Sequence, residues 1–158
     1  MKQDLNQRKN IRLESHDYSR AGCYFITICV IEKHPMLGKI LPVQQEIVLS
    51  EIGWTVKNEI RKIPDCYEDV AIDKYVVMPN HIHMILTTGN RTQIATSVSR
   101  IIKQFKGSIT KQIGFSLWQR SFYDHVVRDQ KDYRRLCQYI EMNPSAWKED
   151  MFFVLDSE

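Results

Sequence analysis

The stretch His81-Ile82-His83, inside the strand-like run from Tyr75 to Leu86, constrains the fold more than any other part of the chain, because two histidines flank one large apolar residue. Side chains on a β-strand point to opposite faces of the sheet in turn, so residues two apart share a face. We therefore expect His81 and His83 on one face. The opposite face, directed into a core, is expected to hold Ile82, Met84 and Leu86. Two imidazoles held this way on a rigid strand can share one metal ion.

The first half of the chain predicts two more strands and a helix. The segment Cys23–Ile31 is rich in β-branched and aromatic residues, which indicates a buried strand. A short strand is expected near Glu46–Leu49. Ser50 is expected to begin a helix and Pro64 to end it. The apolar face of that helix is formed by Ile52, Val56, Ile60 and Ile63.

Two strands follow, at Glu68–Met78 and His81–Thr88, joined at Pro79-Asn80. Thr92 is expected to cap a second helix, which runs to about Ile113 and stops at Gly114. Its apolar residues fall within about 100° on a helical wheel. They are Ile94, Val98, Ile101, Ile102, Phe105 and Ile109.

The remaining segments predict a last strand and a last helix. Leu117–Arg128 is a strand candidate, Asp129 is expected to start a helix, and Pro144 is expected to end it. This order of elements with short connections predicts an α+β fold, a ferredoxin-like (RRM-like) antiparallel sheet with helices packed on it.

A chain of 158 residues has the size of one domain. We place that domain at residues 21–150, preceded by a polar, basic arm at 1–20 and followed by a tail at 151–158. No apolar run approaches the length of a membrane span, and the polar start is unlike a secretory signal. The cysteines form no CxxC pair, so free buried thiols in a reducing cytoplasm are expected for Cys23, Cys29, Cys66 and Cys137.

The net charge of +3 is unevenly distributed. Between Arg100 and Arg135 there are nine Lys or Arg residues against three acidic residues. A basic field of this kind suggests a polyanionic partner. Two helices with ordinary solvated faces would give the same count, and charge alone does not separate these interpretations.

The last predicted helix carries a polar row beside its apolar stripe. The stripe consists of Tyr133, Leu136, Cys137 and Ile140. Tyr139 lies about 110° from the centre of that stripe, taking about 100° per residue. It shares a face with Arg135 one turn earlier and with Asn143 one turn later. A tyrosine held for packing would more often lie where Tyr133 does.

These residue types suit phosphoryl chemistry. A phenol titrates near pH 10, so tyrosine is a poor nucleophile unless its phenolate is stabilised. A divalent ion held by the histidine pair could stabilise the charge that develops on a phosphate. An amide oxygen from Asn143 suits Mg²⁺ or Mn²⁺, and the imidazoles favour Mn²⁺. Arg135 could bind a phosphate through two hydrogen bonds.

Three stretches together carry a family resemblance. They are Tyr-Val-Val-Met-Pro-Asn-His-Ile-His, Leu-Trp-Gln-Arg-Ser-Phe-Tyr-Asp-His-Val-Val-Arg and Gln-Tyr-Ile-Glu-Met-Asn-Pro-Ser-Ala-Trp. The chain resembles the REP-associated tyrosine transposases, which belong with the smallest insertion-sequence transposases to the single-tyrosine branch of the HUH (His, hydrophobic, His) nucleases. The resemblance extends from about Tyr18 to Trp147.

The resemblance implies a metal-dependent transposase or endonuclease that cleaves and rejoins single-stranded DNA at hairpins of palindromic repeats, through a 5′-phosphotyrosine intermediate. It implies that His81 and His83 are metal ligands, that Asn143 is the third ligand and that Tyr139 is the nucleophile. The metal would be Mg²⁺ or Mn²⁺. Whether the protein acts as a monomer or as a homodimer that exchanges the tyrosine remains open.

The DNA itself is expected to contact basic residues in the second half of the chain. These are Arg100, Lys103, Lys111, Arg120 and Arg135. Asp124 and His125 lie in a family-like stretch, but no chemical step is assigned to them.

Each of these residues also has a purely structural interpretation. The histidines could be ordinary sheet residues, Tyr139 a packing residue and Asn143 a helix terminator. The rival function is a non-catalytic single-stranded nucleic-acid-binding module of RRM-like fold, with bases stacked on Tyr24 and Phe25. A hydrolytic metalloenzyme is disfavoured, because no acidic ligand cluster accompanies the histidines. Metal-dependent nicking distinguishes these functions.

Overall fold

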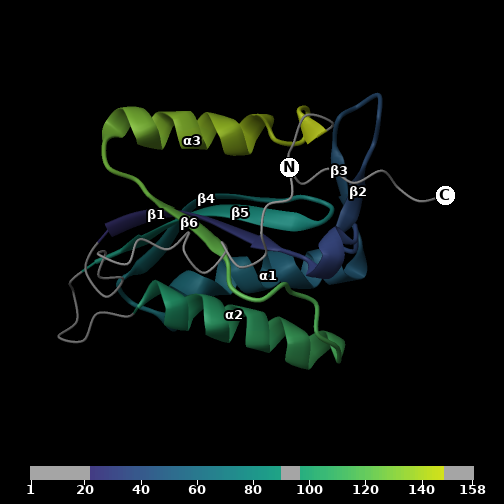
Figure 1. The fold of residues 1–158 in the computed structure, drawn as a ribbon, viewed down its shortest axis with the longest axis horizontal. Coiled ribbons are helices and arrows are strands. Elements are labelled where there is room, and N and C mark those ends of the chain that lie inside the picture. The colour runs from purple at the N-terminus through teal and green to yellow at the C-terminus, as the bar shows by residue number, and fades with distance from the viewer. Residues whose placement is uncertain (1–21, 90–96, 148–158) are drawn as a thin grey trace.

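Four strands pair in one antiparallel sheet in the order β4-β5-β1-β6 (Figure 1). The computed structural model describes residues 22–89 and 97–147. The strands are β1 (Gly22–Cys29), β4 (Val70–Val77), β5 (His81–Thr88) and β6 (Tyr123–Val126). With a helix connecting β1 to β4 and another connecting β5 to β6, this order confirms the ferredoxin-like fold.

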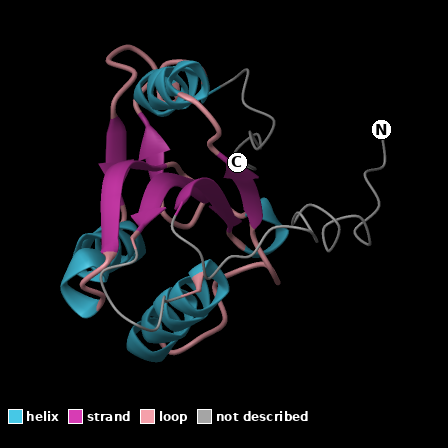
Figure 2. Cartoon of the chain, turned by 90° about the vertical axis from the view of Figure 1, so that its left-hand side faces the viewer, coloured by secondary structure: helices cyan, strands magenta, loops and turns pink. Residues whose placement is uncertain are grey.

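Helices cover both faces of the sheet (Figures 1 and 2). On one face lie α1 (Glu51–Cys66) and α2 (Val98–Ile113), whereas α3 (Gln130–Met142) is the helix of the described residues that lies on the other. Two short strands, β2 (Gly38–Ile40) and β3 (Ile47–Leu49), form a separate hairpin, and a 3₁₀ turn, η2 (Ile31–Lys33), follows β1. No helix in the described part of the chain combines the length and apolar character needed to cross a bilayer.

The alternation predicted for β5 divides the apolar residues into two cores. Ile82, Met84 and Leu86 join the larger core beneath α1 and α2. The smaller core lies beneath α3 and is formed by Ile85, Leu136 and Ile140. His81 and His83 lie two and four residues before Ile85 on the strand, so they face α3. The prediction that the two histidines share a face opposite Ile82, Met84 and Leu86 is confirmed.

Helix α1 begins as expected, with the Ser50 hydroxyl accepting a hydrogen bond from the amide of Gly53 at 3.0 Å. Its end was predicted too early: Pro64 lies in the last turn, and the helix ends at Cys66. Proline removes one backbone hydrogen bond. Burial of Ile63 in the core holds the turn in place despite that loss.

Helix α2 begins at Val98 with Ser97 as its cap, so the prediction of a cap at Thr92 was wrong. Thr92 and Ile94 lie outside the described residues. The rest of the predicted apolar face is buried, namely Val98, Ile101, Ile102, Phe105 and Ile109. Gly114 ends the helix with φ at 87°, a left-handed conformation that favours glycine.

The strand predicted at Leu117–Arg128 is confirmed only at β6. Its first half is anchored by burial of Leu117 and Trp118, and Ser121 has a positive φ of 65°, which breaks the extended backbone. Lys106 of α2 holds this segment by donating to the carbonyls of Gln119 and Ser121. Tertiary packing therefore replaces alternation in this stretch.

Helix α3 begins at the predicted cap, where the Asp129 carboxylate accepts from the amide of Asp132 at 2.7 Å. It ends at Met142, just before Asn143 and Pro144. All four cysteines are free thiols, but only Cys29 is fully buried, and Cys66 is exposed. The predicted arm at 1–20 and the tail at 151–158 lie outside the described residues.

Candidate active site

The two histidines of β5 are completely enclosed beneath the C-terminal half of α3. His81 has none of its surface exposed and His83 has 1%. Their Nε2 atoms are 3.0 Å apart. A pair at this distance must share either a proton or an ion, because two nitrogen lone pairs repel each other.

Each imidazole is oriented by a hydrogen bond at its other nitrogen. His81 donates from Nδ1 to the side-chain oxygen of Asn80 at 2.7 Å. The Nδ1 of His83 bonds to the Thr27 hydroxyl of β1, also at 2.7 Å. When both Nδ1 atoms carry the proton, both Nε2 atoms present lone pairs to the same point. Orientation of ligand histidines by such partners is usual around bound metals.

The spacing of the two Nε2 atoms fits an ion. Ligands at right angles around an ion at about 2.1 Å are about 3.0 Å apart. Asn143, the predicted third ligand, has an oxygen of the type that suits such an ion: this residue is 2% exposed, and its Oδ1 is buried with no hydrogen-bond partner among the described residues. An unpaired buried acceptor costs about 1–3 kcal/mol, so a ligand for it is expected.

Acidic groups are not part of this arrangement. Within residues 22–89 and 97–147, no three His, Cys, Asp or Glu side chains gather as a metal cluster. The candidate ligand set is two imidazoles and one amide, which suits a single ion rather than a two-metal centre.

Aromatic rings enclose the histidine pair. Phe25 of β1 stacks on His83 at a centroid distance of 5.2 Å, and Trp147 stacks on His81 at 6.1 Å. Tyr139 of α3 meets His83 edge to face at 5.2 Å. Asn143 lies between Tyr139 and Trp147 in the chain, so α3 and the turn after it cover both imidazoles.

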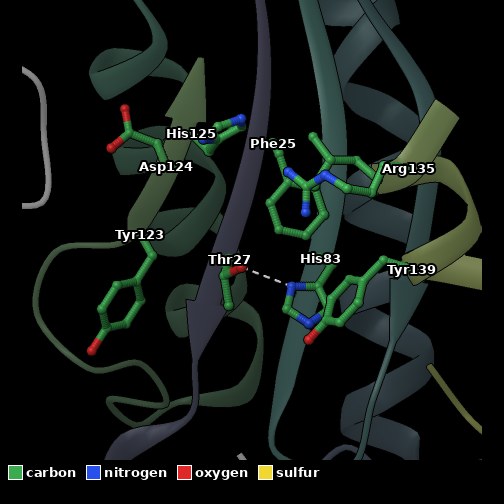
Figure 3. Close-up of a pocket in the computed structure, with 9 residues that line it drawn as sticks. Phe25, Thr27, His83, Tyr123, Asp124, His125, Arg135 and Tyr139 are labelled. Atoms are coloured by element: carbon green, nitrogen blue, oxygen red, sulfur yellow. Dashed lines mark hydrogen bonds between the residues drawn. The ribbon is translucent and has the colours of Figure 1, made fainter. Parts of the chain in front are cut away.

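Tyr139 differs from the packing tyrosine on the same helix. Tyr139 is 40% exposed and its ring meets the His83 imidazole edge to face, with the phenol oxygen near the imidazole nitrogen that does not bond to Thr27 (Figure 3). Tyr133 instead donates from its hydroxyl to the Asp73 carboxylate of β4 at 3.0 Å, and this bond raises the pKa of Tyr133 well above its usual value. Both positions match the predicted stripe and polar row.

A pocket of about 290 Å³ opens beside Tyr139, between α3 and the edge strand β6 (Figure 3). Its lining includes Thr27 and His83 at the bottom and Arg135 at the rim. The Arg135 guanidinium donates to Asp132 at 2.7 Å, and the same carboxylate bonds to His125 of β6 at 2.6 Å. These two bonds hold the pKa of Asp132 below its usual value, and the bond to His125 has the larger effect.

The structure separates the predicted basic residues. Arg135 reaches the pocket, whereas Arg100, Lys103 and Lys111 are exposed on α2, across the sheet from the histidines. Arg120 is exposed in the segment before β6. The cations of α2 therefore do not converge on the histidine pair, and their contact with DNA stays a prediction.

Four residues around the histidine pair were not predicted from the sequence as its partners. Asn80 precedes the histidines directly, which was a usable signal, because a polar residue next to a ligand often orients it. Thr27, Phe25 and Trp147 reach the site through strand pairing and through the turn after α3. Thr27 faces His83 because the two are register partners in the β1–β5 ladder.

The chain is similar to known proteins in both sequence and fold. A family model described as "Transposase IS200 like" matches residues 41–143, a range that includes both histidines, Tyr139 and Asn143. An uncharacterized protein of Haemophilus influenzae is 32% identical over 173 aligned residues, which cover 95% of each chain. A REP-associated tyrosine transposase of Escherichia coli K12 is 36% identical over 80% of this chain and 68% of its own.

A solved structure of a REP-associated tyrosine transposase bound to a REP hairpin superposes with a TM-score of 0.64. It covers 85% of this chain and 73% of its own, at 24% sequence identity. This likeness confirms the fold.

Proposed function

This chain belongs to the IS200-like family of DNA transposases, with REP-associated tyrosine transposases among its relatives, and we propose that it cleaves and rejoins single-stranded DNA through Tyr139. The DNA would be a hairpin with unpaired flanks; the solved structure of similar fold is bound to a REP hairpin. The intermediate would be a 5′-phosphotyrosine.

One observation carries the proposal: the partly exposed Tyr139 contacts His83, one of two buried histidines whose Nε2 atoms face each other within the same chain. A nucleophile must be accessible to the strand, and Tyr139 is. The groups that stabilise developing charge must be held rigidly, and burial together with the bonds to Asn80 and Thr27 does this.

In the cleavage step, the Tyr139 oxygen attacks the scissile phosphorus, a new P–O bond forms, and the bond from phosphorus to the 3′ oxygen breaks. The phenol proton is lost and the departing oxygen gains one, so the products are a 5′-phosphotyrosine and a free 3′-hydroxyl. Attack by the 3′-hydroxyl of a second strand reverses the exchange, because the phosphodiester bond is conserved in the covalent intermediate.

The donor set fits a divalent ion, Mg²⁺ or Mn²⁺, which His81, His83 and Asn143 would hold. When bound, such an ion would polarise a phosphate oxygen and lower the cost of charge on the phenol. Arg135, at the rim of the pocket, is positioned to bind a phosphate oxygen while Asp132 keeps its side chain in place.

The structure disfavours the rival function, a non-catalytic RRM-like module that stacks bases on the rings of its sheet. Tyr24 is completely buried in the core beneath α1 and α2, and Phe25 is packed against His83 and Tyr139. Helix α3 covers the sheet face on which an RNA-recognition domain stacks bases. The sequence-based suggestion of stacking is therefore wrong for Tyr24, whereas Phe25 is half-buried in the wall of the pocket beside Tyr139.

The test is covalent trapping of DNA by wild type and by Tyr139→Phe. Hairpin oligonucleotides copied from palindromic repeats around the gene are incubated with Mn²⁺ or with a chelator, and adducts are resolved on denaturing gels. We expect adducts from wild type with Mn²⁺ only, and none from Tyr139→Phe, which retains the ring packing on His83. Tyr133→Phe is the matched control and should still form adducts. Adducts from Tyr139→Phe would refute the assignment.

A further inference from the structure

The pocket beside Tyr139 continues into a second cavity along the N-terminal half of α3. The first has a volume of about 290 Å³ and the second about 500 Å³. Both are lined by His125 and Arg135, so they adjoin. We refer to the two together as the α3–β6 trough. Because β6 is the edge strand of the sheet, the trough runs along an open side of the described fold.

The end of the trough nearest Tyr139 is aromatic. Tyr123 is the register partner of Thr27, and His125 that of Phe25, so all four share the face that α3 covers. Figure 3 shows Tyr123 and Tyr139 on opposite sides of Thr27 and His83. Aromatic walls with a few polar groups at the rim are typical of sites for a planar ring.

The far end of the trough is basic. It is lined by Arg128, Lys131 and Arg135 together with two carboxylates. Both carboxylates are already engaged, since Asp129 caps α3 and Asp132 binds His125 and Arg135. Arg128 and Lys131 form no ion pair with any other described residue. Their charge is therefore available to an anion.

An aromatic end beside the nucleophile and a basic end beyond it match the chemistry of one unpaired strand. We propose that the α3–β6 trough holds the single strand on one side of the scissile phosphate, with one base at Tyr123 and the next phosphates at Arg128 and Lys131. This inference rests on the proposed function and adds the path of the strand to it. A single strand fits because an unpaired base has a free π-face, whereas bases within a duplex are covered by their neighbours.

The test measures affinity separately from chemistry, in full-length protein carrying Tyr139→Phe. The probes are fluorescent hairpins with unpaired flanks of ten nucleotides in which one flank position at a time is abasic. We expect one position on one flank to weaken binding about fivefold or more. Adding Tyr123→Ala should cause a similar loss and abolish sensitivity to that abasic site, and Tyr123→Phe should restore it.

Salt dependence tests the basic end. Arg128→Ala and Lys131→Ala should each lower the slope of log affinity against log salt by about 0.7, the value for one phosphate contact on a single strand. Arg61→Ala, an exposed arginine of α1 across the sheet, is the matched control and should leave the slope unchanged.

The proposal would be overturned if Tyr123→Ala and every abasic site weakened binding independently and additively. It would also be overturned if Arg128→Ala and Lys131→Ala left the salt slope unchanged. Adduct formation by the chain with Tyr139 intact is measured in parallel. If adducts form but Tyr123→Ala does not abolish sensitivity to an abasic site, the proposed strand path in the trough is wrong and the phosphotyrosine chemistry stands. If Tyr123→Ala abolishes that sensitivity but no adducts form, the phosphotyrosine chemistry is wrong and the strand path stands. Thermal melting of Tyr123→Ala checks its fold, and the abasic scan and salt slopes stand without that variant.

Discussion

Replacing Thr27 by Val removes one hydroxyl beneath His83 and leaves nearly the same shape. His83 is 1% exposed, and its Nδ1 bonds to that hydroxyl at 2.7 Å. Without it, a buried imidazole nitrogen is left without its partner, which costs about 1–3 kcal/mol of the free energy of unfolding. The loss is measured by urea denaturation in the presence of a chelator.

The effect on metal binding is a separate prediction from the same bond. At a Mn²⁺ concentration 100 times the wild-type Kd, the ion adds about 2.7 kcal/mol to the free energy of unfolding. Loss of a partner that orients a ligand weakens metal affinity by about 10- to 100-fold. At that Mn²⁺ concentration, the increment for Thr27→Val should fall to about 0.4–1.4 kcal/mol.

Thr88→Val is the matched control, because Thr88 is also buried in the sheet and its hydroxyl accepts from the amide of Gly22 at 3.1 Å. It should lower stability in the chelator and keep the full Mn²⁺ increment. If Thr27→Val keeps the full increment as well, the hydroxyl does not orient His83 towards an ion, and the argument from the histidine pair fails.

Two further predictions concern α3 and the turn after it. Asn143→Leu removes the unpaired buried oxygen, so the metal-free variant should be as stable as wild type or more stable, by up to about 1–3 kcal/mol. The free energy of unfolding that Mn²⁺ adds to wild type should disappear in this variant. A variant that is destabilised and still stabilised by Mn²⁺ would contradict the ligand assignment. Because His125 and Arg135 lower the pKa of Asp132, its contribution to stability is present above its unfolded pKa of about 3.9 and is lost as pH falls through the folded pKa. In Asp132→Asn, the urea midpoint should therefore decline less steeply below pH 5 than in wild type, and parallel curves from pH 2 to 6 would refute this contribution.

The fold was largely predictable because most segments carry a clear period. The alternation around His81 fixed which residues of β5 face the larger core, and the cap residues Ser50 and Asp129 located two helix starts. The failures lie where packing competes with local pattern. Burial of Leu117 and Trp118 breaks the expected strand before β6, and Ser97 rather than Thr92 caps α2.

The site was predictable in part. Angles on the last helix separated Tyr139 from the packing tyrosine, because a helical wheel needs no tertiary information. The partners of the histidines were less accessible. Thr27 is 56 residues away from His83 in the chain, and only the register of β1 against β5 places it beneath the ring. The position of α2 across the sheet from the histidines was likewise invisible in its charge pattern.

The eight residues of strand β5 contribute both to the core and to the proposed active site. A slip of one residue in its pairing would turn both imidazoles into the apolar core under α1 and α2 and would leave aliphatic side chains at the proposed metal site. Mispaired molecules would therefore lose stability and the proposed nicking activity together. For a protein whose proposed function is to cleave DNA strands, this would limit cleavage to folded molecules, since only a correctly paired sheet brings the proposed catalytic groups together.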